Sequence, residues 1–253
     1  MLIKIGKEEN AVVEVSGQDV YKYINNTYAC INAKTLLNHF KELEDIPITS
    51  MRDSYVIESH NSRNFILPEK EENFRLEEWT CKNMVINYPT VGEGKTCFGR
   101  LVGYQIPIKA PDLIDKSKNA GLGKIDMLSV NDETAFILEL KVEDSTEHPL
   151  RAFLEAYTYW KLLGGDDAKK FLAKSDAKNA KKLDKAVVFY KNSCIHNKMK
   201  NMDDDMKELI IKLGVSCFLV GEKEQGNSEG SNSKKHRITF VDVEKEDCID
   251  KNS

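Results

Sequence analysis

The chain has 253 residues, of which 41% are hydrophobic and 31% charged, and this is the composition of an ordinary soluble globular protein. The formal net charge of −4 gives no overall sign of nucleic-acid binding. No apolar run approaches the ~20 residues that span a bilayer, and the N-terminus becomes charged too soon for a signal peptide. The six cysteines form no CxxC pair and suggest no disulfide framework, which argues against a zinc site made of cysteines and predicts a reduced, cytoplasmic protein.

The first 70 residues are expected to form an N-terminal extension or a small α+β subdomain, and their pattern does not decide between the two. The apolar runs LIKI and AVVEV predict two short strands. Residues 19–24 and 33–43 predict helices, the second because its apolar residues recur at helical spacing.

The segment that follows is predicted to contain a helix and the first strand of the central sheet. A helix is predicted over residues 69–84, where charged residues are interleaved with large apolar ones. Residues 100–109 predict the first strand of the sheet, and Pro107 and Pro111 suggest that this strand ends at an edge. Residues 110–123 are polar and small, which is typical of a loop.

A hairpin and a helix between residues 124 and 163 organise the rest of the chain. KIDMLSV and AFILELKV are β-compatible runs on either side of the turn-forming sequence NDET, and together they predict a β-hairpin. Pro149 is well placed as the first residue of a strongly amphipathic helix, which Gly164 ends.

Three polar residues interrupt the apolar hairpin: Asp126, Glu139 and Lys141. Glu139 and Lys141 are two positions apart, so their side chains leave the same face of one strand. In an antiparallel pair, Asp126 can lie beside the end of that strand. Two carboxylates so close are unfavourable unless a proton or a cation joins them, and their hard oxygens suit Mg²⁺ or Mn²⁺. A neighbouring lysine can orient a water molecule or stabilise charge developing on a phosphate.

The alternative interpretation is that Glu139 and Lys141 are an exposed pair on a solvent face, as a Glu-x-Lys sequence on a strand usually is. The residues before them argue against it. Both faces of the strand are largely apolar at its start, as in a central strand covered on both sides. Charges at the end of such a strand need partners. The metal-site interpretation is therefore favoured.

An Ile-Asp pair, twelve further residues and then Glu-Leu-Lys form a pattern that resembles the PD-(D/E)XK nuclease superfamily, with Ile125 in the place of the proline. The following helix contains LEAYTY, which is similar to the Gln-x-x-x-Tyr signature of the exonuclease branch, with Glu155 in the place of the glutamine. The resemblance covers roughly residues 70–220. It implies a restriction-endonuclease-like fold and a nuclease that depends on Mg²⁺ or Mn²⁺.

The same resemblance assigns roles to the residues of the motif. Asp126 and Glu139 would hold one or two metal ions, and the main-chain carbonyl of Leu140 would be a further ligand. Lys141 would position the attacking water or help to deprotonate it. Gln105, in the first strand of the sheet, is a further side chain that could point towards the metal.

Two helices are expected to complete the site. In the family a helix ahead of the hairpin often supplies another acidic metal ligand, for which Glu77 or Glu78 is the candidate; the alternative is that both are solvated. Arg151, Glu155 and Tyr159 recur every four residues and lie in one row of the second helix. If this row faces the site, Glu155 and Tyr159 could steady the lysine or a backbone phosphate. A surface salt bridge between Arg151 and Glu155 is the alternative.

After this helix, AVVFY and VSCFLV predict two buried strands with a helix between them. The fold class is therefore α/β, with a mixed central sheet flanked by helices and a restriction-endonuclease-like αβββαβ core after an N-terminal elaboration. We place the nuclease-like core at residues 71–220 and a flexible loop at residues 221–236. A C-terminal strand and tail at residues 237–253 follow.

These features predict a metal-dependent nuclease that acts on DNA more readily than on RNA. The lysine-rich segment at residues 161–200 is either its phosphate-binding surface or a solvated helix and loop. The alternative function is a catalytically inactive module that binds nucleic acid or protein and keeps the fold, and a hydrolase of other phosphoesters is a third. No membrane partner is expected, and a homodimer is compatible with the sequence.

Overall fold

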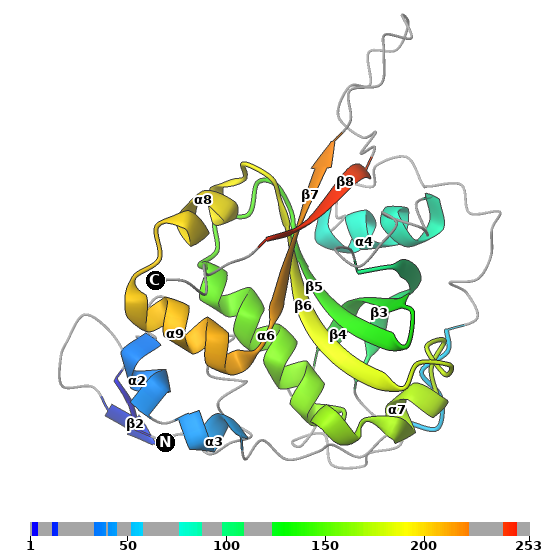
Figure 1. Cartoon of the computed structure of the whole chain (residues 1–253), viewed down its shortest axis with the longest axis horizontal. Helices are drawn as coiled ribbons and strands as arrows, with labels where there is room; N and C mark the ends of the chain where they lie inside the picture. The colour runs from blue at the N-terminus through cyan, green and yellow to red at the C-terminus, as the bar shows by residue number, and fades with distance from the viewer. Residues whose placement is uncertain are drawn as a thin grey trace, which may run out of the picture.

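A mixed six-stranded sheet with helices on both faces forms the centre of the computed structural model (Figure 1). The ranges that the structure describes, and to which every structural statement below applies, are residues 2–4, 12–14, 33–38, 40–44, 52–57, 76–87, 98–108, 123–222 and 240–246.

The strands of this sheet are, in chain order, β3 (Arg100–Pro107), β4 (Lys124–Asn131), β5 (Thr134–Lys141), β6 (Lys182–Tyr190), β7 (Ser216–Glu222) and β8 (Phe240–Glu246). Each strand pairs with the next one along the chain. The first three form an antiparallel meander, β5, β6 and β7 run parallel, and β8 returns antiparallel at the edge. The predicted α/β class with a mixed sheet is therefore confirmed.

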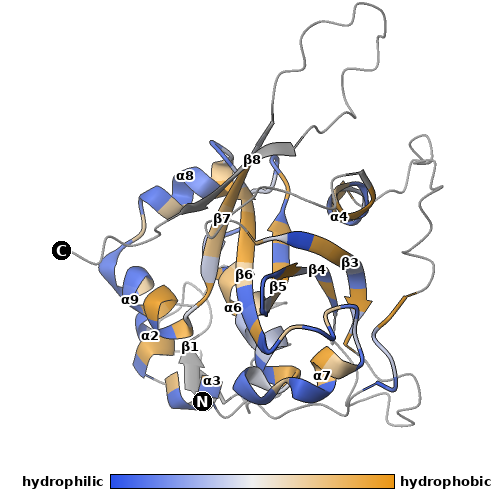
Figure 2. Ribbon diagram, turned by 45° about the vertical axis from the view of Figure 1, so that its right-hand side comes forward, coloured by the Kyte–Doolittle hydropathy of each residue, from blue (hydrophilic) through white to orange (hydrophobic). Residues whose placement is uncertain are grey.

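Helices cover the two faces of the sheet unequally. On one face lies α4 (Leu76–Asn87), the helix that precedes β3. The other face carries α6 (Pro149–Leu162), the short η3 (Gly165–Asp167), α7 (Lys169–Ala173), α8 (Cys194–Lys200) and α9 (Asp204–Leu213). Hydrophobic residues run along β6 and β7 between these layers, whereas hydrophilic residues prevail on α8 (Figure 2).

Strand β5 shows why this arrangement follows from the sequence. Ala135 and Ile137 are buried against the α6 side, while Leu138 and Leu140 are buried against the α4 side. A strand with alternating apolar residues on both faces must be covered on both faces. The prediction that this strand is central is confirmed.

Helix α6 begins and ends where the sequence predicts. Pro149 is its first residue, and the ring of His148 accepts a hydrogen bond from the main-chain N–H of Leu150. At the other end, Gly164 has a φ of 112°, a conformation that glycine adopts without a steric penalty. The apolar stripe of the helix, which includes Phe153 and Trp160, is buried in the core.

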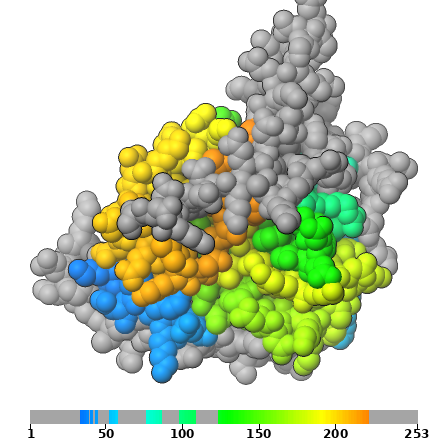
Figure 3. All heavy atoms as spheres, in the orientation of Figure 1, coloured from blue at the N-terminus to red at the C-terminus, as the bar shows by residue number. Residues whose placement is uncertain are grey.

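The N-terminal region contributes short elements. Strands β1 (Leu2–Lys4) and β2 (Val12–Glu14) lie where two short strands are predicted. They pair with each other in a two-stranded antiparallel sheet. The single helix predicted over residues 33–43 is wrong in part, because two helices, α2 (Ala33–Asn38) and α3 (Phe40–Glu44), occupy it. Helix α2 packs against α9 (Figure 3), and Leu36, Leu43 and Tyr55 join the core on the α6 side.

Several expected segments fall outside the described residues or are displaced. The helix at residues 19–24, the loop at residues 110–123 (all but its last residue) and most of the flexible loop at residues 221–236 lie outside the described residues. Helix α4 starts later and ends later than the expected residues 69–84. No described helix is both long and apolar enough to cross a membrane.

Gly99, just before β3, lets that strand approach β4 closely. Its φ is 81°, and a Cβ atom there would lie 2.3 Å from the carbonyl oxygen of Val130. Gly99→Ala is therefore expected to lower the free energy of unfolding by about 3 kcal/mol in denaturant titrations. Gly221→Ala is the matched control, because a Cβ there meets nothing within 4 Å, and it should change stability by less than about 0.5 kcal/mol. Equal effects of the two substitutions would contradict this account of Gly99.

Candidate metal centre

The site lies where β4 and β5 stop pairing. Their ladder runs from the Asn131–Thr134 pair to the Met127–Leu138 pair. Beyond it, the main-chain N–H of Leu140 donates a hydrogen bond to Oδ2 of Asp126, at 3.0 Å. The carboxylate of Asp126 thus takes the place that a main-chain carbonyl of β4 would have in a continued ladder.

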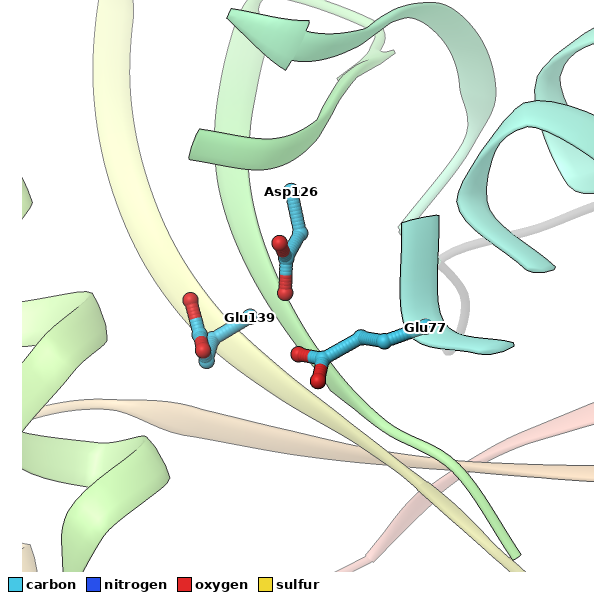
Figure 4. Close-up of side chains that lie close together, drawn as sticks. All are labelled: Glu77, Asp126 and Glu139. Carbon is cyan, nitrogen blue, oxygen red and sulfur yellow. The ribbon is translucent and has the colours of Figure 1, made fainter. Parts of the chain in front are cut away.

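Three carboxylates converge in this gap, as predicted for the hairpin acids. Glu77 reaches it from α4, Asp126 from β4 and Glu139 from β5, and the three side chains point towards one another (Figure 4). One oxygen of each lies within 4.8 Å of the others. Oxygens that bind one divalent ion at 2.0–2.6 Å are at most about 5.2 Å apart, so the three groups can share an ion with small rotations.

Burial makes this cluster electrostatically unusual. Asp126 and Glu139 are only 7% and 5% exposed. Loss of hydration raises the pKa of Asp126 well above its usual range, and the neighbouring charge of Glu77 raises it further. The pKa of Glu139 is raised well above its usual range for the same reason, with the charge of Asp126 adding to the effect. The groups around Asp126 and Glu139 therefore do not carry enough positive charge to stabilise both of these residues as carboxylates.

Lys141 is the cation closest to the cluster among the described residues. Its Nζ lies 2.8 Å from Oε1 of Glu139 and 3.2 Å from Oε2 of Glu155. The same atom lies 3.4 Å from Oε1 of Glu77 and 3.5 Å from Oε2 of Glu147. Burial alone would lower the pKa of Lys141, but the carboxylates outweigh it and raise this pKa well above its usual range. The ammonium group therefore stays charged.

Glu155 contacts both Lys141 and Arg151, and Arg151 lies on the same helix as Glu155. Nε of Arg151 donates to Oε1 of Glu155 at 3.0 Å, and Nη1 of Arg151 donates to Oε1 of Glu147 at 2.8 Å. Burial alone would raise the pKa of Glu155, but Lys141 and Arg151 outweigh it and lower this pKa. Glu155 therefore contacts both Lys141 and Arg151, and because it is buried, its pair with Arg151 is not the surface salt bridge of the alternative. Its role at the site stays a prediction.

The other residues implied by the resemblance are placed as follows. Leu140 is fully buried, and the role of its carbonyl oxygen as a ligand stays a prediction. Tyr159 lies one turn beyond Glu155 and is buried in the core on the α6 side, and its catalytic role also stays a prediction. Glu78 is nearly half exposed and lies 3.9 Å from Nζ of Lys124, so Glu77 is the acid of α4 that joins the cluster.

Two residues, Glu147 and Gln105, make more contacts at the site than their sequence pattern indicates. Glu147, in the connection from β5 to α6, pairs with both Lys141 and Arg151. Its only signal in the sequence is the spacing of four residues to Arg151. Gln105 donates from Nε2 to Oδ1 of Asp126 at 3.1 Å. A cavity of about 570 Å³ opens beside this pair.

Most exposed lysines of the lysine-rich segment lie at the other end of the sheet. Lys182 pairs with Thr134, at the start of β5, whereas Phe189 pairs with Lys141 at its end. Seven residues of strand, about 23 Å, separate these two levels. The exposed lysines between residues 169 and 182 therefore do not surround the acidic cluster.

No family model matches the sequence, and neither the curated proteins nor the solved structures searched contain a significant match. The structure therefore establishes that the chain has an α/β fold and a buried acidic cluster that could hold a divalent metal ion.

Proposed function

We propose that this protein is a metal-dependent nuclease of the PD-(D/E)XK kind that hydrolyses phosphodiester bonds of DNA. The observation that carries the proposal is the convergence of Asp126, Glu139 and Lys141 in one gap of the sheet, joined by Glu77 from α4. Apart from the short helices η3 and α7 that follow α6, the order of elements from α4 through β3, β4, β5 and α6 to β6 is the αβββαβ order that the resemblance implies.

The charge balance supports a bound cation. Two described cations against five described carboxylates leave a formal charge of −3. The cations are Lys141 and Arg151, and the carboxylates are those of Glu77, Asp126, Glu139, Glu147 and Glu155. The buried groups among them, Asp126, Glu139, Glu155 and Lys141, leave a formal charge of −2 by themselves. A buried excess of negative charge is costly unless protons or a cation compensate it. Because all the candidate ligands are hard oxygens, Mg²⁺ or Mn²⁺ fits this donor set.

The ligands would be Glu77, Asp126 and Glu139. The main-chain N–H of Leu140 points to Asp126, and a strand residue directs its N–H and C=O to the same neighbour, which supports its carbonyl oxygen as a further ligand. A divalent ion, when bound, offsets charge on the scissile phosphate and lowers the pKa of a bound water.

Side chains of the protein carry the other roles in the proposed reaction. Lys141 is a fixed cation at the edge of the cluster, where it can orient the attacking water and stabilise negative charge on the phosphate. Glu155 holds this lysine from α6, and Arg151 in turn holds Glu155. Glu155 is therefore a positioning residue for Lys141 in this proposal.

The proposal is tested by incubating the purified protein with linear, circular and single-stranded DNA, and with RNA, in Mg²⁺, Mn²⁺ or EDTA. Cleavage of DNA is expected with either ion and should cease in EDTA, because the acidic cluster then lacks the cation that compensates its charge. Cleavage that persists in EDTA would contradict the proposal. Mn²⁺ binding without cleavage of any nucleic acid would instead favour the inactive binding module.

A further inference from the structure

Gln105 has an unusual conformation at the point of β3 that faces the acidic cluster. Its neighbours Tyr104 and Ile106 pair with Met127 and Ile125, so Gln105 lies opposite Asp126. Its φ is 47°, in the left-handed region that residues with a side chain rarely adopt. Nothing in a regular strand requires this conformation.

This conformation changes the side of the sheet on which the neighbouring residues of β3 are buried. Tyr104 is buried on the α4 side and Ile106 on the α6 side, although residues two apart in a regular strand share a face. The side of the sheet towards which alternate side chains of β3 point thus reverses at Gln105. The same reversal occurs across Asp126 in β4, where Ile125 and Met127 are buried on opposite sides. The two irregularities lie side by side.

At this point the side chain of Gln105 meets the cluster. Its Nε2 donates to Oδ1 of Asp126 at 3.1 Å, while the N–H of Leu140 donates to Oδ2 at 3.0 Å. Both carboxylate oxygens are therefore held by neutral donors, and each keeps a lone pair for a further partner. Gln105 also lines the 570 Å³ cavity, together with Asp126 and Glu77.

We propose that Gln105 is a positioning residue of the metal centre. Its amide fixes the plane of the Asp126 carboxylate, so that this group can share an ion with Glu77 and Glu139. This inference rests on the proposed metal-binding function. The strained conformation of Gln105 is kept because it brings the amide to Asp126. Partners that orient a metal ligand typically change metal affinity by about 10- to 100-fold when they are removed.

Two substitutions separate this role from a merely structural one. Gln105→Gly removes the amide but also relieves the left-handed strain, because glycine adopts positive φ readily. Gln105→Leu removes the amide and keeps the strain. Stability in EDTA should therefore be retained or raised in the first variant and lowered in the second. Both variants should bind Mn²⁺ about 10- to 100-fold more weakly than the wild type.

Calorimetric titration with Mn²⁺ and thermal melting in EDTA, on the full chain, test these expectations. Weakened Mn²⁺ binding in both variants, with a melting temperature that is retained or raised in Gln105→Gly and lowered in Gln105→Leu, is the expected result. A Gln105→Gly variant that binds Mn²⁺ as tightly as the wild type would overturn the inference and leave the proposed function standing. A Gln105→Gly variant that melts well below the wild type would also overturn it, by showing a structural role. A wild-type chain that binds no Mn²⁺ would overturn the proposed function and this inference with it.

Discussion

Lys141→Met is expected to lower the free energy of unfolding in EDTA by about 3–5 kcal/mol, because it leaves buried carboxylates without their cation. The ammonium group of Lys141 lies within 3.5 Å of four carboxylates, two of which belong to the buried residues Glu139 and Glu155. Cleavage should be lost as well. Mn²⁺ should stabilise this variant more than the wild type, because the added ion then compensates charge that the lysine no longer balances. Chemical denaturation with and without Mn²⁺ measures both effects.

Lys181→Met is the matched control. Lys181 also pairs with a glutamate, Glu133, but both side chains are mostly exposed. Exposed pairs contribute about 0–1 kcal/mol, so this variant should be nearly as stable as the wild type and should cleave normally. If Lys141→Met matched the control in stability and still cleaved DNA, the role assigned to Lys141 would be wrong.

Glu139→Gln is expected to reduce DNA cleavage by at least about 10³-fold, which corresponds to roughly 4 kcal/mol of lost transition-state stabilisation. The substitution keeps the size of the side chain and an oxygen that can accept from Lys141. It removes one charge from a cluster with an excess of negative charge, so the fold in EDTA should be retained. Initial cleavage rates and circular dichroism spectra check the two expectations.

Glu147→Gln controls for the loss of a charge near Lys141. Glu147 lies 3.5 Å from the lysine but is not one of the three acids that approach one another within 4.8 Å. This variant should retain cleavage to within about tenfold, as expected for a change of about 1 kcal/mol. Equal losses of activity in the two variants would show that net charge, rather than a set of ligands, determines activity.

The hairpin and its charged residues could be predicted because their signals are local. Alternating apolar residues and the turn sequence NDET define two strands, and a spacing of two places Glu139 and Lys141 on one face. The approach of Asp126 follows from antiparallel pairing. These arguments need no knowledge of the rest of the chain.

The remaining parts of the site depend on tertiary structure. Glu77 and Glu78 are neighbours on a helix whose apolar residues do not mark one face clearly, so the rotation of α4 could not be predicted. The side chain of Gln105 could be expected to point towards the metal, but its contact with Asp126 depends on a reversal in β3 that does not show in the periodicity of the sequence. Glu147 comes from an irregular connection, where patterns give no side-chain direction. Helix α8 spans only seven residues, too few for a helical periodicity to stand out in the sequence.

The acidic gap between β4 and β5 is tested most directly by calorimetric titration of Mn²⁺ into the wild-type chain, Glu139→Gln and Glu147→Gln. Binding to the wild type and to Glu147→Gln, with no detectable heat for Glu139→Gln, is the expected result, because only Glu139 is one of the three converging acids. Equal binding by Glu139→Gln and the wild type, or no binding by the wild type, would contradict the metal centre.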